Sequence, residues 1–228
     1  MILCLVALAI GTAGTSTARA TPLFQADSYP ASIDGGGKGT RTTFWFNGAA
    51  WECGTSIFKG ELTGAASALT LAPTYEECRW NYPPVNPPAW STVKVLMNGC
   101  DYRLHSLEKT AADAYSSLMD LQCPPGQQMV VELNSGPWTI CRLTVSAQAG
   151  KTSVPITDNT GKEGGLDDVG AKLHAQGLKY TQDLPGSPIA CPIKPGTYEF
   201  LDVKQEFPTT LTATSEPGKQ IGFRVNGE

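Results

Sequence analysis

The chain has 228 residues, of which only 17% are charged, and its formal net charge is −4. Lysines and arginines are scattered without a basic cluster, which argues against nucleic acids and anionic membranes as partners. The 24 glycines and 17 prolines are typical of turn-rich β-structure, because these residues adopt the backbone conformations that tight turns require.

The first twenty residues have the features of a secretory signal peptide. The run "MILCLVALAI" is apolar and uncharged, and Ala18-Arg19-Ala20 fits the small-x-small pattern before a signal-peptidase cut. The run is shorter than the about 20 residues that span a bilayer, and Cys4 lies away from the cleavage point, unlike a lipoprotein cysteine. We predict cleavage after Ala20, no membrane insertion after cleavage, and a secreted or cell-surface location.

The remaining sequence predicts an all-β fold. Residues 21–41 lack periodicity and end in a glycine run, so we predict a flexible arm there. From residue 42 onward, turn signals separate short apolar or alternating runs about every 8–15 residues, the spacing of an antiparallel sandwich or barrel-like fold. We divide the strands into an N-terminal set, 42–150, and a C-terminal set, 151–228, packed with the first as one unit.

Four segments carry distinct local signals. "TSIFKGEL" and "SALTLAPTY" flank "TGAA" and predict a hairpin. "STVKVLM" and "CDYRLHS" predict one long strand with a bulge at Asn98-Gly99. "SLEKTAADAY" contains good helix formers and predicts about one helical turn. In "LDDVGAKLHAQG" the alternation from Val169 to Ala175 is longer than the helical spacing, so it predicts a strand.

The cysteines left after signal cleavage are even in number, which in an exported chain indicates disulfides. They are Cys53, Cys78, Cys100, Cys123, Cys141 and Cys191. There is no Cys-x-x-Cys in the sequence, and neither His105 nor His174 is near a cysteine pair, which argues against a zinc site or a redox-active pair. We expect no metal and no cofactor.

Hairpin geometry predicts the first two bridges, because partners across a hairpin have numbers that sum to twice the turn centre. The midpoint between Cys53 and Cys78 falls between residues 65 and 66, inside a predicted turn. The midpoint between Cys100 and Cys123 falls near residue 111, inside the connection between two strands. The pairing of Cys78 with Cys100 centres on Ala89, in a proline-rich loop, and remains the main competitor.

The third bridge follows by elimination. Cys123 and Cys141 centre on Glu132, at the end of an apparent strand, and would lie two strand spacings of about 4.8 Å apart. This exceeds the limit of about 7 Å between bonded Cα atoms. We therefore predict that Cys141 pairs with Cys191 and joins the C-terminal strand set to the first.

Several motifs follow one another along residues 42–226. They are "WECGTSIFKGELTG", "LTLAPTYEECRW", "VKVLMNGCDYRLHS", "LQCPPGQQMVVEL", "CRLTVSAQ", "GLKYT" and "GTYEF". Their order resembles a family of secreted conserved hypothetical proteins of high-GC Gram-positive bacteria. That family has no assigned activity, so the resemblance implies fold and export and carries over no functional residue.

The segment "RWNYPPVNPPAW" is the main candidate for binding. It combines four prolines with Trp80, Tyr82 and Trp90. One interpretation is a protruding aromatic loop that stacks on a sugar ring or a peptide. The other, which we favour because tryptophan is usually highly buried, is a stiff polyproline-like connection whose tryptophans pack on the sheet. We predict that residues 81–89 are strand-free and exposed, with Trp80 or Trp90 anchoring one end.

Acidic residues give weaker candidates. Glu76-Glu77 and Asp167-Asp168 are adjacent pairs, and neighbours on a strand point to opposite faces, which favours solvated charges over a glycosidase pair. "TDNTGKEGGLDD" departs from the EF-hand pattern at its third and fifth positions, which favours a flexible turn over a calcium loop. Its potential oxygen ligands are Asp158, Asn159, Glu163, Asp167 and Asp168.

Three functional hypotheses remain. The leading one is an exported or cell-surface-associated β-protein with a structural or binding role, without catalysis, whose partner is a cell-wall glycan or a protein. The second is a carbohydrate- or peptide-binding module that uses Trp80, Tyr82 and Trp90. The third is a hydrolase, although the sequence has no Gly-x-Ser-x-Gly and His105 and His174 are isolated. Two facing carboxylates or a histidine–carboxylate contact would favour this third hypothesis.

Overall fold

A computed structural model describes residues 21–46, 49–80, 91–150, 153–161, 166–183, 196–205, 208–216 and 219–226. Within these ranges the regular structure consists of antiparallel β-strands, without a helix. The predicted all-β class is therefore confirmed. It also follows that the described residues contain no helix that could cross a bilayer.

The strands run along the whole described chain. As far as residue 122 they are β1 (Leu23–Ala26), β2 (Ala31–Phe46), β3 (Ala49–Leu62), β4 (Leu69–Trp80), β5 (Ser91–Leu96), β6 (Asp101–Ala111) and β7 (Ala114–Gln122). Beyond it they are β8 (Met129–Ser135), β9 (Trp138–Val145), β10 (Ser153–Asp158), β11 (Val169–Ala171), β12 (His174–Asp183), β13 (Gly196–Gln205), β14 (Thr209–Glu216), β15 (Lys219–Ile221) and β16 (Phe223–Asn226).

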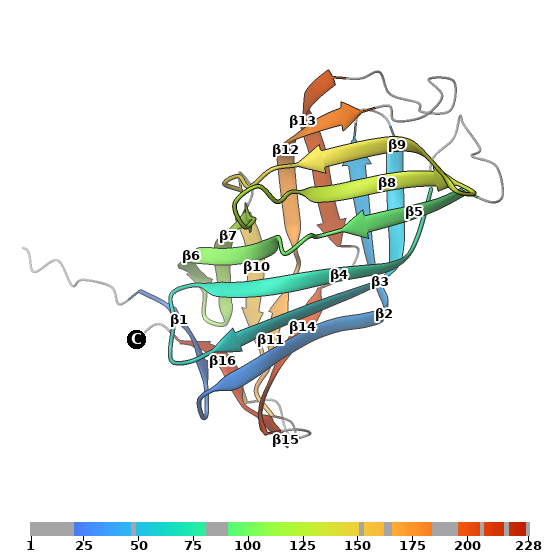
Figure 1. Ribbon diagram of the computed structural model, residues 1–228. Coiled ribbons are helices and arrows are strands. Elements are labelled where there is room, and N and C mark those ends of the chain that lie inside the picture. The colour runs from blue at the N-terminus through green and yellow to red at the C-terminus, as the bar shows by residue number, and fades with distance from the viewer. Residues whose placement is uncertain are drawn as a thin grey trace, which may run out of the picture.

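The long strand β2 organises the fold, because it has two different partners along one edge. Residues 32–35 pair with β14, and residues 42–46 pair with β13. Starting from the first half of β2, hydrogen-bonded neighbours follow in the order β2, β3, β4, β6, β7, β10, β11 and β14. The last of these strands, β14, pairs back with β2. These strands form a closed ring (Figure 1).

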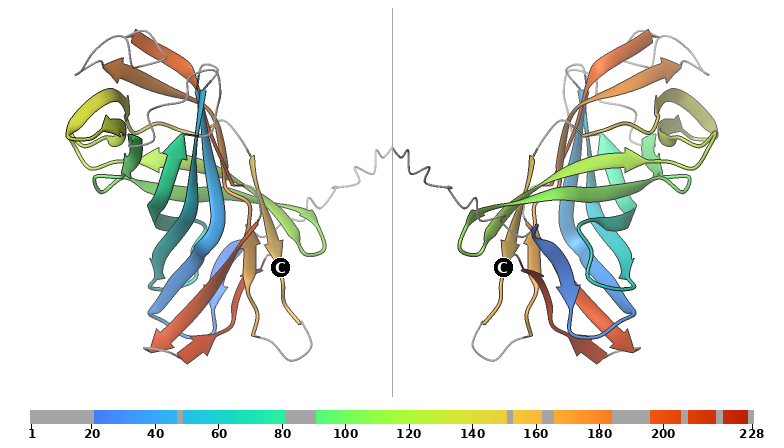
Figure 2. Two further views of the ribbon diagram at one scale, coloured as in Figure 1. Left: turned by 90° about the vertical axis from the view of Figure 1, so that its right-hand side faces the viewer. Right: turned by 90° about the vertical axis from the view of Figure 1, so that its left-hand side faces the viewer.

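The second half of β2 begins another curved sheet. It continues through β13, β12, β9, β8 and β5, and β5 lies beside β4. The ring and this second sheet therefore share β2, β3 and β4. Figure 2 shows the two parts one above the other, joined by the long β2 and β3 strands. One continuous apolar cluster fills both parts.

The glycine run at 35–39 lies where β2 passes from the ring to the second sheet. The register between β2 and β3 shifts between Lys38 and Thr42. Gly36 has a φ of 78°, and a Cβ there would meet the carbonyl oxygen of Ser56 on β3. This close approach requires glycine, because any other residue would overlap the neighbouring backbone.

The predicted flexible arm at 21–41 is wrong. Its first part is β1, which pairs with β16, and its second part is most of β2. Phe24, Ala31 and Ile33 from this segment are buried in the core. The glycine run has the composition of a loop, but β3 and β14 supply hydrogen-bond partners from distant parts of the sequence.

Two further local predictions are wrong. The segment predicted to contain a helical turn belongs to the β6–β7 hairpin, because pairing with β7 outweighs helical propensity. Asn98 and Gly99, predicted as a bulge in one long strand, form a turn between β5 and β6, with φ values of 52° and 79°. The strand prediction around Val169–Ala175 is confirmed by β11 and β12, with a break at Lys172-Leu173.

The proposed division at residue 150 does not separate two bodies of strands. β10, β11 and β14 complete the ring together with N-terminal strands, and β12 and β13 lie between β9 and β2. Strands from both halves of the sequence thus alternate in both parts of the fold.

Two predicted disulfides are confirmed. Cys53 and Cys78 are bonded and lie directly opposite each other on β3 and β4. Cys100 and Cys123 are bonded at the open end of the β6–β7 hairpin, which excludes the pairing of Cys78 with Cys100. Disulfides persist in oxidising compartments, so these bridges indicate an extracytoplasmic environment.

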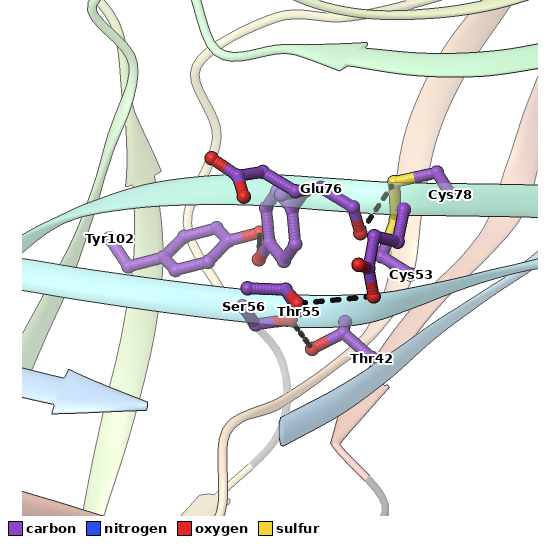
Figure 3. Close-up of a disulfide and its surroundings, with 9 residues drawn as sticks. Thr42, Cys53, Thr55, Ser56, Glu76, Cys78 and Tyr102 are labelled. Atoms are coloured by element: carbon purple, nitrogen blue, oxygen red, sulfur yellow. Dashed lines mark hydrogen bonds between the residues drawn. A yellow bond between two sulfur atoms is a disulfide. The ribbon is translucent and has the colours of Figure 1, made fainter. Parts of the chain in front are cut away.

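Buried hydroxyl pairs surround the first bridge (Figure 3). The Thr42 and Ser56 hydroxyls lie 2.8 Å apart between β2 and β3, and the Tyr75 and Tyr102 hydroxyls lie 2.9 Å apart. Burial raises the pKa of Tyr102 to about 12, so this pair is neutral at physiological pH. Each hydroxyl satisfies the other, which limits the cost of burying polar groups in the ring.

Only one cysteine of the third predicted bridge lies among the described residues. Cys141 is fully buried on β9 and is disulfide-bonded. Its predicted partner, Cys191, lies outside the described residues. The pairing of these two cysteines therefore remains a prediction.

Candidate functional site

Trp80 lies at the end of β4 and packs into an aromatic cluster. Its ring is half-buried and lies 6.1 Å from Phe46 and 5.9 Å from Trp51, measured between ring centroids. Trp51 is fully buried and its ring lies 4.2 Å from that of Phe46. Trp80 is thus placed as an anchor, and the other two predicted binding residues, Tyr82 and Trp90, lie outside the described residues.

Trp138, which sequence reasoning missed, is an exposed tryptophan on the β8–β9 hairpin. Trp138 begins β9, just after the turn that connects it to β8, and its side chain is 73% exposed. It pairs with Ser135, which in turn pairs with Ser91 at the start of β5. Two strand spacings of about 4.8 Å therefore separate Trp138 from the point where the proline-rich segment ends. The only sequence signal for it was a tryptophan directly after a turn.

The β8–β9 hairpin that carries Trp138 is held by side-chain contacts. The Thr139 hydroxyl donates a 2.7 Å hydrogen bond to the side-chain carbonyl of Asn134, next to the turn. Farther along, Arg142 and Glu132 form an ion pair at 2.9 Å. These contacts hold the turn next to Trp138 in place.

A small hollow lies toward the other end of β9. Its volume is about 260 Å³, and its walls include Thr144, Ser146, Gln148, Lys179 and Thr181. The Gln148 side chain accepts a hydrogen bond from the Lys179 backbone N–H and donates one to the Lys179 carbonyl, at 2.8 and 3.0 Å. This volume is below the usual range of about 300–1,000 Å³ for small-molecule sites, so we do not place a ligand here.

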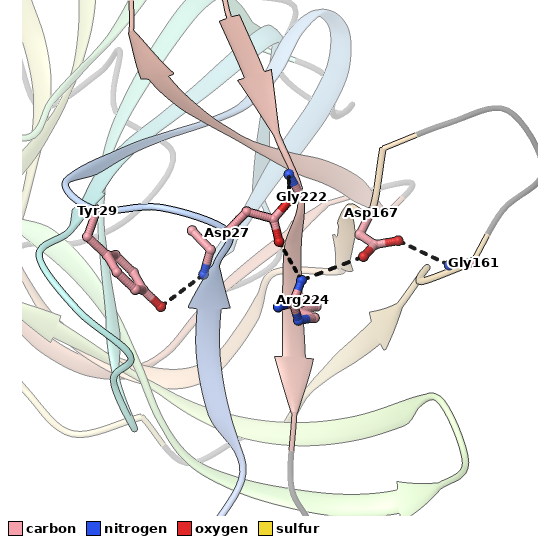
Figure 4. Close-up of polar contacts among 7 residues, drawn as sticks. Asp27, Tyr29, Gly161, Asp167, Gly222 and Arg224 are labelled. Atoms are coloured by element: carbon pink, nitrogen blue, oxygen red, sulfur yellow. Dashed lines mark hydrogen bonds and ion pairs between the residues drawn. The ribbon is translucent and has the colours of Figure 1, made fainter.

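The acidic segment proposed as a weak calcium loop uses its carboxylates for structural contacts (Figure 4). Asp167 accepts a hydrogen bond from the Gly161 N–H at 3.1 Å and lies 3.8 Å from Arg224 on β16. Arg224 also contacts Asp27 at 2.7 Å. No group of three or more potential metal ligands is present among the described residues; Glu163 lies outside them.

The remaining acidic candidates have similar local contacts. Asp168 accepts a 2.6 Å hydrogen bond from the Asn159 side chain. Glu76 and Glu77 are both exposed on β4, and Thr55 donates a long hydrogen bond of 3.5 Å to Glu77. Asp168 and Glu77 are thus held by separate local partners.

Asp158, at the end of β10, gives a prediction on pH. Burial, and then the charge of Asp167, raise the pKa of Asp158 to about 6 from 3.8. The folded state therefore binds this proton more tightly than the unfolded state, and stability falls as pH rises from about 4 to above 6. We expect Asp158→Asn to raise the free energy of unfolding at pH 7.5 by about 1 kcal/mol, a value reduced for solvent screening.

The measurement is chemical denaturation at several pH values. Asp158→Asn should flatten the pH dependence of the free energy of unfolding between pH 4 and 6.5 relative to the wild-type protein. An Asp158→Asn protein less stable than wild type at pH 7.5 would contradict the sign of this prediction.

The histidine–carboxylate contact that would favour a hydrolase is present on the β6–β7 hairpin. His105 Nε2 lies 3.0 Å from Asp120 Oδ2, and His105 Nδ1 lies 2.8 Å from the hydroxyl of Ser106. Asp120 Oδ1 accepts a hydrogen bond from the Gly150 N–H at 3.0 Å. The other histidine, His174 on β12, is half-buried, and burial lowers its pKa.

Sequence reasoning did not find this cluster. His105 and Ser106 are adjacent in the sequence, but Asp120 is brought next to them only by the pairing of β6 with β7. Comparison with protein families, with curated proteins and with solved structures finds no significant match to this chain. Any function must therefore be argued from the arrangement of its own residues.

Proposed function

We propose that the protein is exported and serves at or outside the cell surface in a binding or structural role. The hydrophobic leader at residues 1–20 supports this location, as do two disulfides, one between paired strands and one at the open end of a hairpin. Export is also what the resemblance to secreted proteins of high-GC Gram-positive bacteria implies. Removal of the leader and the extracytoplasmic site of the protein are parts of this proposal.

The observation that carries a binding role is the exposure of Trp138. A tryptophan buries about 150–250 Å² when it packs against another surface, and leaving 73% of this side chain in water forgoes most of that stabilisation. Its fixed hairpin and its position near the end of the proline-rich segment favour a surface that stacks on a ligand. The ligand class is a sugar ring of a cell-wall glycan, or a peptide.

The experiment is a pull-down of the mature protein with purified cell wall and with a panel of glycans. We expect Trp138→Ala to weaken retention by about 10-fold or more, because tryptophans at binding hot spots contribute about 2 kcal/mol or more. Thermal unfolding of the variant should remain close to wild type, since the side chain is mostly exposed.

Trp45 on β2 provides a matched control. Its side chain is 45% exposed but it lies on a different strand, so Trp45→Ala should retain binding. Equal loss in both variants, or no retention of the wild-type protein on any cell-wall or glycan sample, would reject the binding surface around Trp138.

A further inference from the structure

A bulge in β6 places two neighbouring side chains on one face of the sheet. His105 pairs with Leu118 and Glu108 pairs with Ser116, so Ser106 and Leu107 together face only Ser117. Leu107 is buried, whereas Ser106 is exposed. In a regular strand, adjacent residues point to opposite faces; the bulge instead brings His105 and Ser106 side by side.

Ser106 has a backbone conformation that glycine normally supplies. Its φ is 53°, and in bulges of this type the left-handed position is usually glycine. Residues held in such conformations cost about 1–3 kcal/mol and cluster at functional sites. The buried Ser117 hydroxyl donates a 2.8 Å hydrogen bond to the His105 carbonyl, which holds the bulge in place.

His105 is oriented by groups on both of its nitrogens. Nδ1 lies 2.8 Å from the Ser106 hydroxyl, and Nε2 is buried 3.0 Å from Asp120 Oδ2. The Nε2–H does not point along this second contact, so it is an ion-pair distance rather than an aligned hydrogen bond. Its attraction is greatest when His105 carries a positive charge, the state that forms when the ring takes a proton from Ser106.

Asp120 is itself fixed from a third segment. Its second carboxylate oxygen accepts the Gly150 N–H at 3.0 Å. The segment before Gly150 is held against β7 by two backbone hydrogen bonds between Leu121 and Gln148, at 2.9 and 3.0 Å. A nucleophile, a base within hydrogen-bond reach and a carboxylate beside the base are therefore present together.

We propose that Ser106 is a catalytic nucleophile that cleaves short O-acyl esters, with His105 as general base and Asp120 as the positioning residue. Ser106 is exposed on the outer face of the sheet, so an acyl group carried by a large polymer, such as an acetylated polysaccharide, can reach it. This activity goes beyond the binding role proposed above and does not depend on Trp138.

The reaction follows from these positions. Ser106 Oγ attacks the ester carbonyl carbon while its proton passes to Nδ1 of His105. The tetrahedral intermediate collapses as His105 gives this proton to the leaving alkoxide, which departs as the alcohol. Water then attacks the acyl-Ser106 ester with His105 as base, and the carboxylic acid is released as the proton returns to Ser106 Oγ.

The first test is covalent labelling of the mature protein with a fluorophosphonate probe, which forms an oxygen–phosphorus bond with an activated serine and releases fluoride. Trypsin should yield the labelled peptide "LHSLEK", residues 104–109, whose single serine is Ser106. We expect this serine to react at least about 100-fold faster than the exposed control Ser67, which has no histidine next to it in the sequence. Equal rates at Ser106 and Ser67 would overturn the proposal.

Variants separate catalysis from folding. Ser106→Gly should abolish labelling and the hydrolysis of p-nitrophenyl acetate without lowering the unfolding midpoint, because glycine suits a φ of 53°. His105→Gln should lower both rates about 100-fold, within the usual range for general-base catalysis. Unchanged hydrolysis in the folded Ser106→Gly protein would show that the proposed nucleophile is wrong.

Asp120 requires a readout that a purely structural role would not change. Asp120→Asn should lower the labelling rate about 10-fold and shift its pH profile, while Ser67→Ala leaves both unchanged. Thermal unfolding of each variant shows whether the fold is retained. A folded Asp120→Asn protein with the wild-type rate and pH profile would exclude the positioning role of Asp120.

Discussion

Replacing Gly36 by alanine is expected to lower the free energy of unfolding by about 3 kcal/mol. The φ of 78° at this residue costs a non-glycine residue about 1–2 kcal/mol. The added Cβ would also meet the carbonyl oxygen of Ser56, and overpacking of this kind costs about 1–3 kcal/mol. Ser56 cannot move away freely because it pairs with Gly37 in the β2–β3 ladder. Chemical denaturation measures the change.

Two other glycines separate the cost of the left-handed backbone conformation from the cost of the overlap with Ser56. Gly39 has a φ of 87° but open space around it, so Gly39→Ala should cost only the conformational part, about 1–2 kcal/mol. Gly64 has open space and no left-handed φ, so Gly64→Ala should be neutral or stabilise by about 0.4–1 kcal/mol. A Gly36→Ala protein as stable as Gly39→Ala would show that the contact with Ser56 is not limiting.

Gly36 also shows why the N-terminal part of the fold was mispredicted. A run of four glycines in five residues is a loop signal by every local criterion. In the folded chain, residues 35–38 pair with β3, and Gly35 pairs in addition with Leu211, more than 170 residues away in sequence. Partners at that distance leave no local sequence pattern. The glycine-rich composition of this central strand was therefore interpreted as that of a flexible arm.

Features determined by short-range geometry were predicted correctly. Cys53 and Cys78 are related by one hairpin, and its turn was readable from "TGAA", so counting from the turn centre identified the bridge. The same reasoning identified Cys100 and Cys123. The prediction of one long strand with a bulge at Asn98-Gly99 failed, because the turn there separates a strand of the second sheet from a strand of the ring, and a sequence does not show to which sheet a strand belongs.

The cluster on the β6–β7 hairpin was beyond sequence reasoning for a related reason. The absence of a known serine-hydrolase motif and the isolation of His105 in the sequence both argued against catalysis. A bulge that turns Ser106 to the same face as His105 cannot be predicted from residue types, since the left-handed residue is serine instead of glycine. Asp120 then contacts His105 diagonally across the strand pair, a relation that exists only once the register is known.

Breaking a bridge between Cys141 and Cys191 is expected to lower the free energy of unfolding by about 4 kcal/mol. Cys141 is fully buried on β9, and the register pairs Gln182 and Asp183 with Leu143 and Arg142. The end of β12 therefore lies beside Cys141, and Cys191 is only eight residues farther along. An extended chain of this length spans up to about 26 Å, which is ample for the two cysteines to meet.

The size of the effect follows from the loop that the bridge closes. The entropy lost by the unfolded chain grows with the length of the closed loop, so a loop of about fifty residues gives more stabilisation than a shorter one. For the loop of about 25 residues closed by Cys53 and Cys78, this relation gives about 3.5 kcal/mol. The Cys53→Ala/Cys78→Ala protein is thus the matched control for Cys141→Ala/Cys191→Ala. Because the bridge would join β9 to the connection between β12 and β13, its loss should first increase hydrogen exchange in these two strands.

Non-reducing peptide mapping tests the pairing directly. The peptides that contain "WTIC" and "IACP" should be recovered as one linked species and should separate on reduction. Recovery of Cys191 as a free thiol would refute the bridge. So would a Cys141→Ala/Cys191→Ala protein whose hydrogen exchange rises uniformly over both parts of the fold, because a bridge at this position must act first on the strands that it joins.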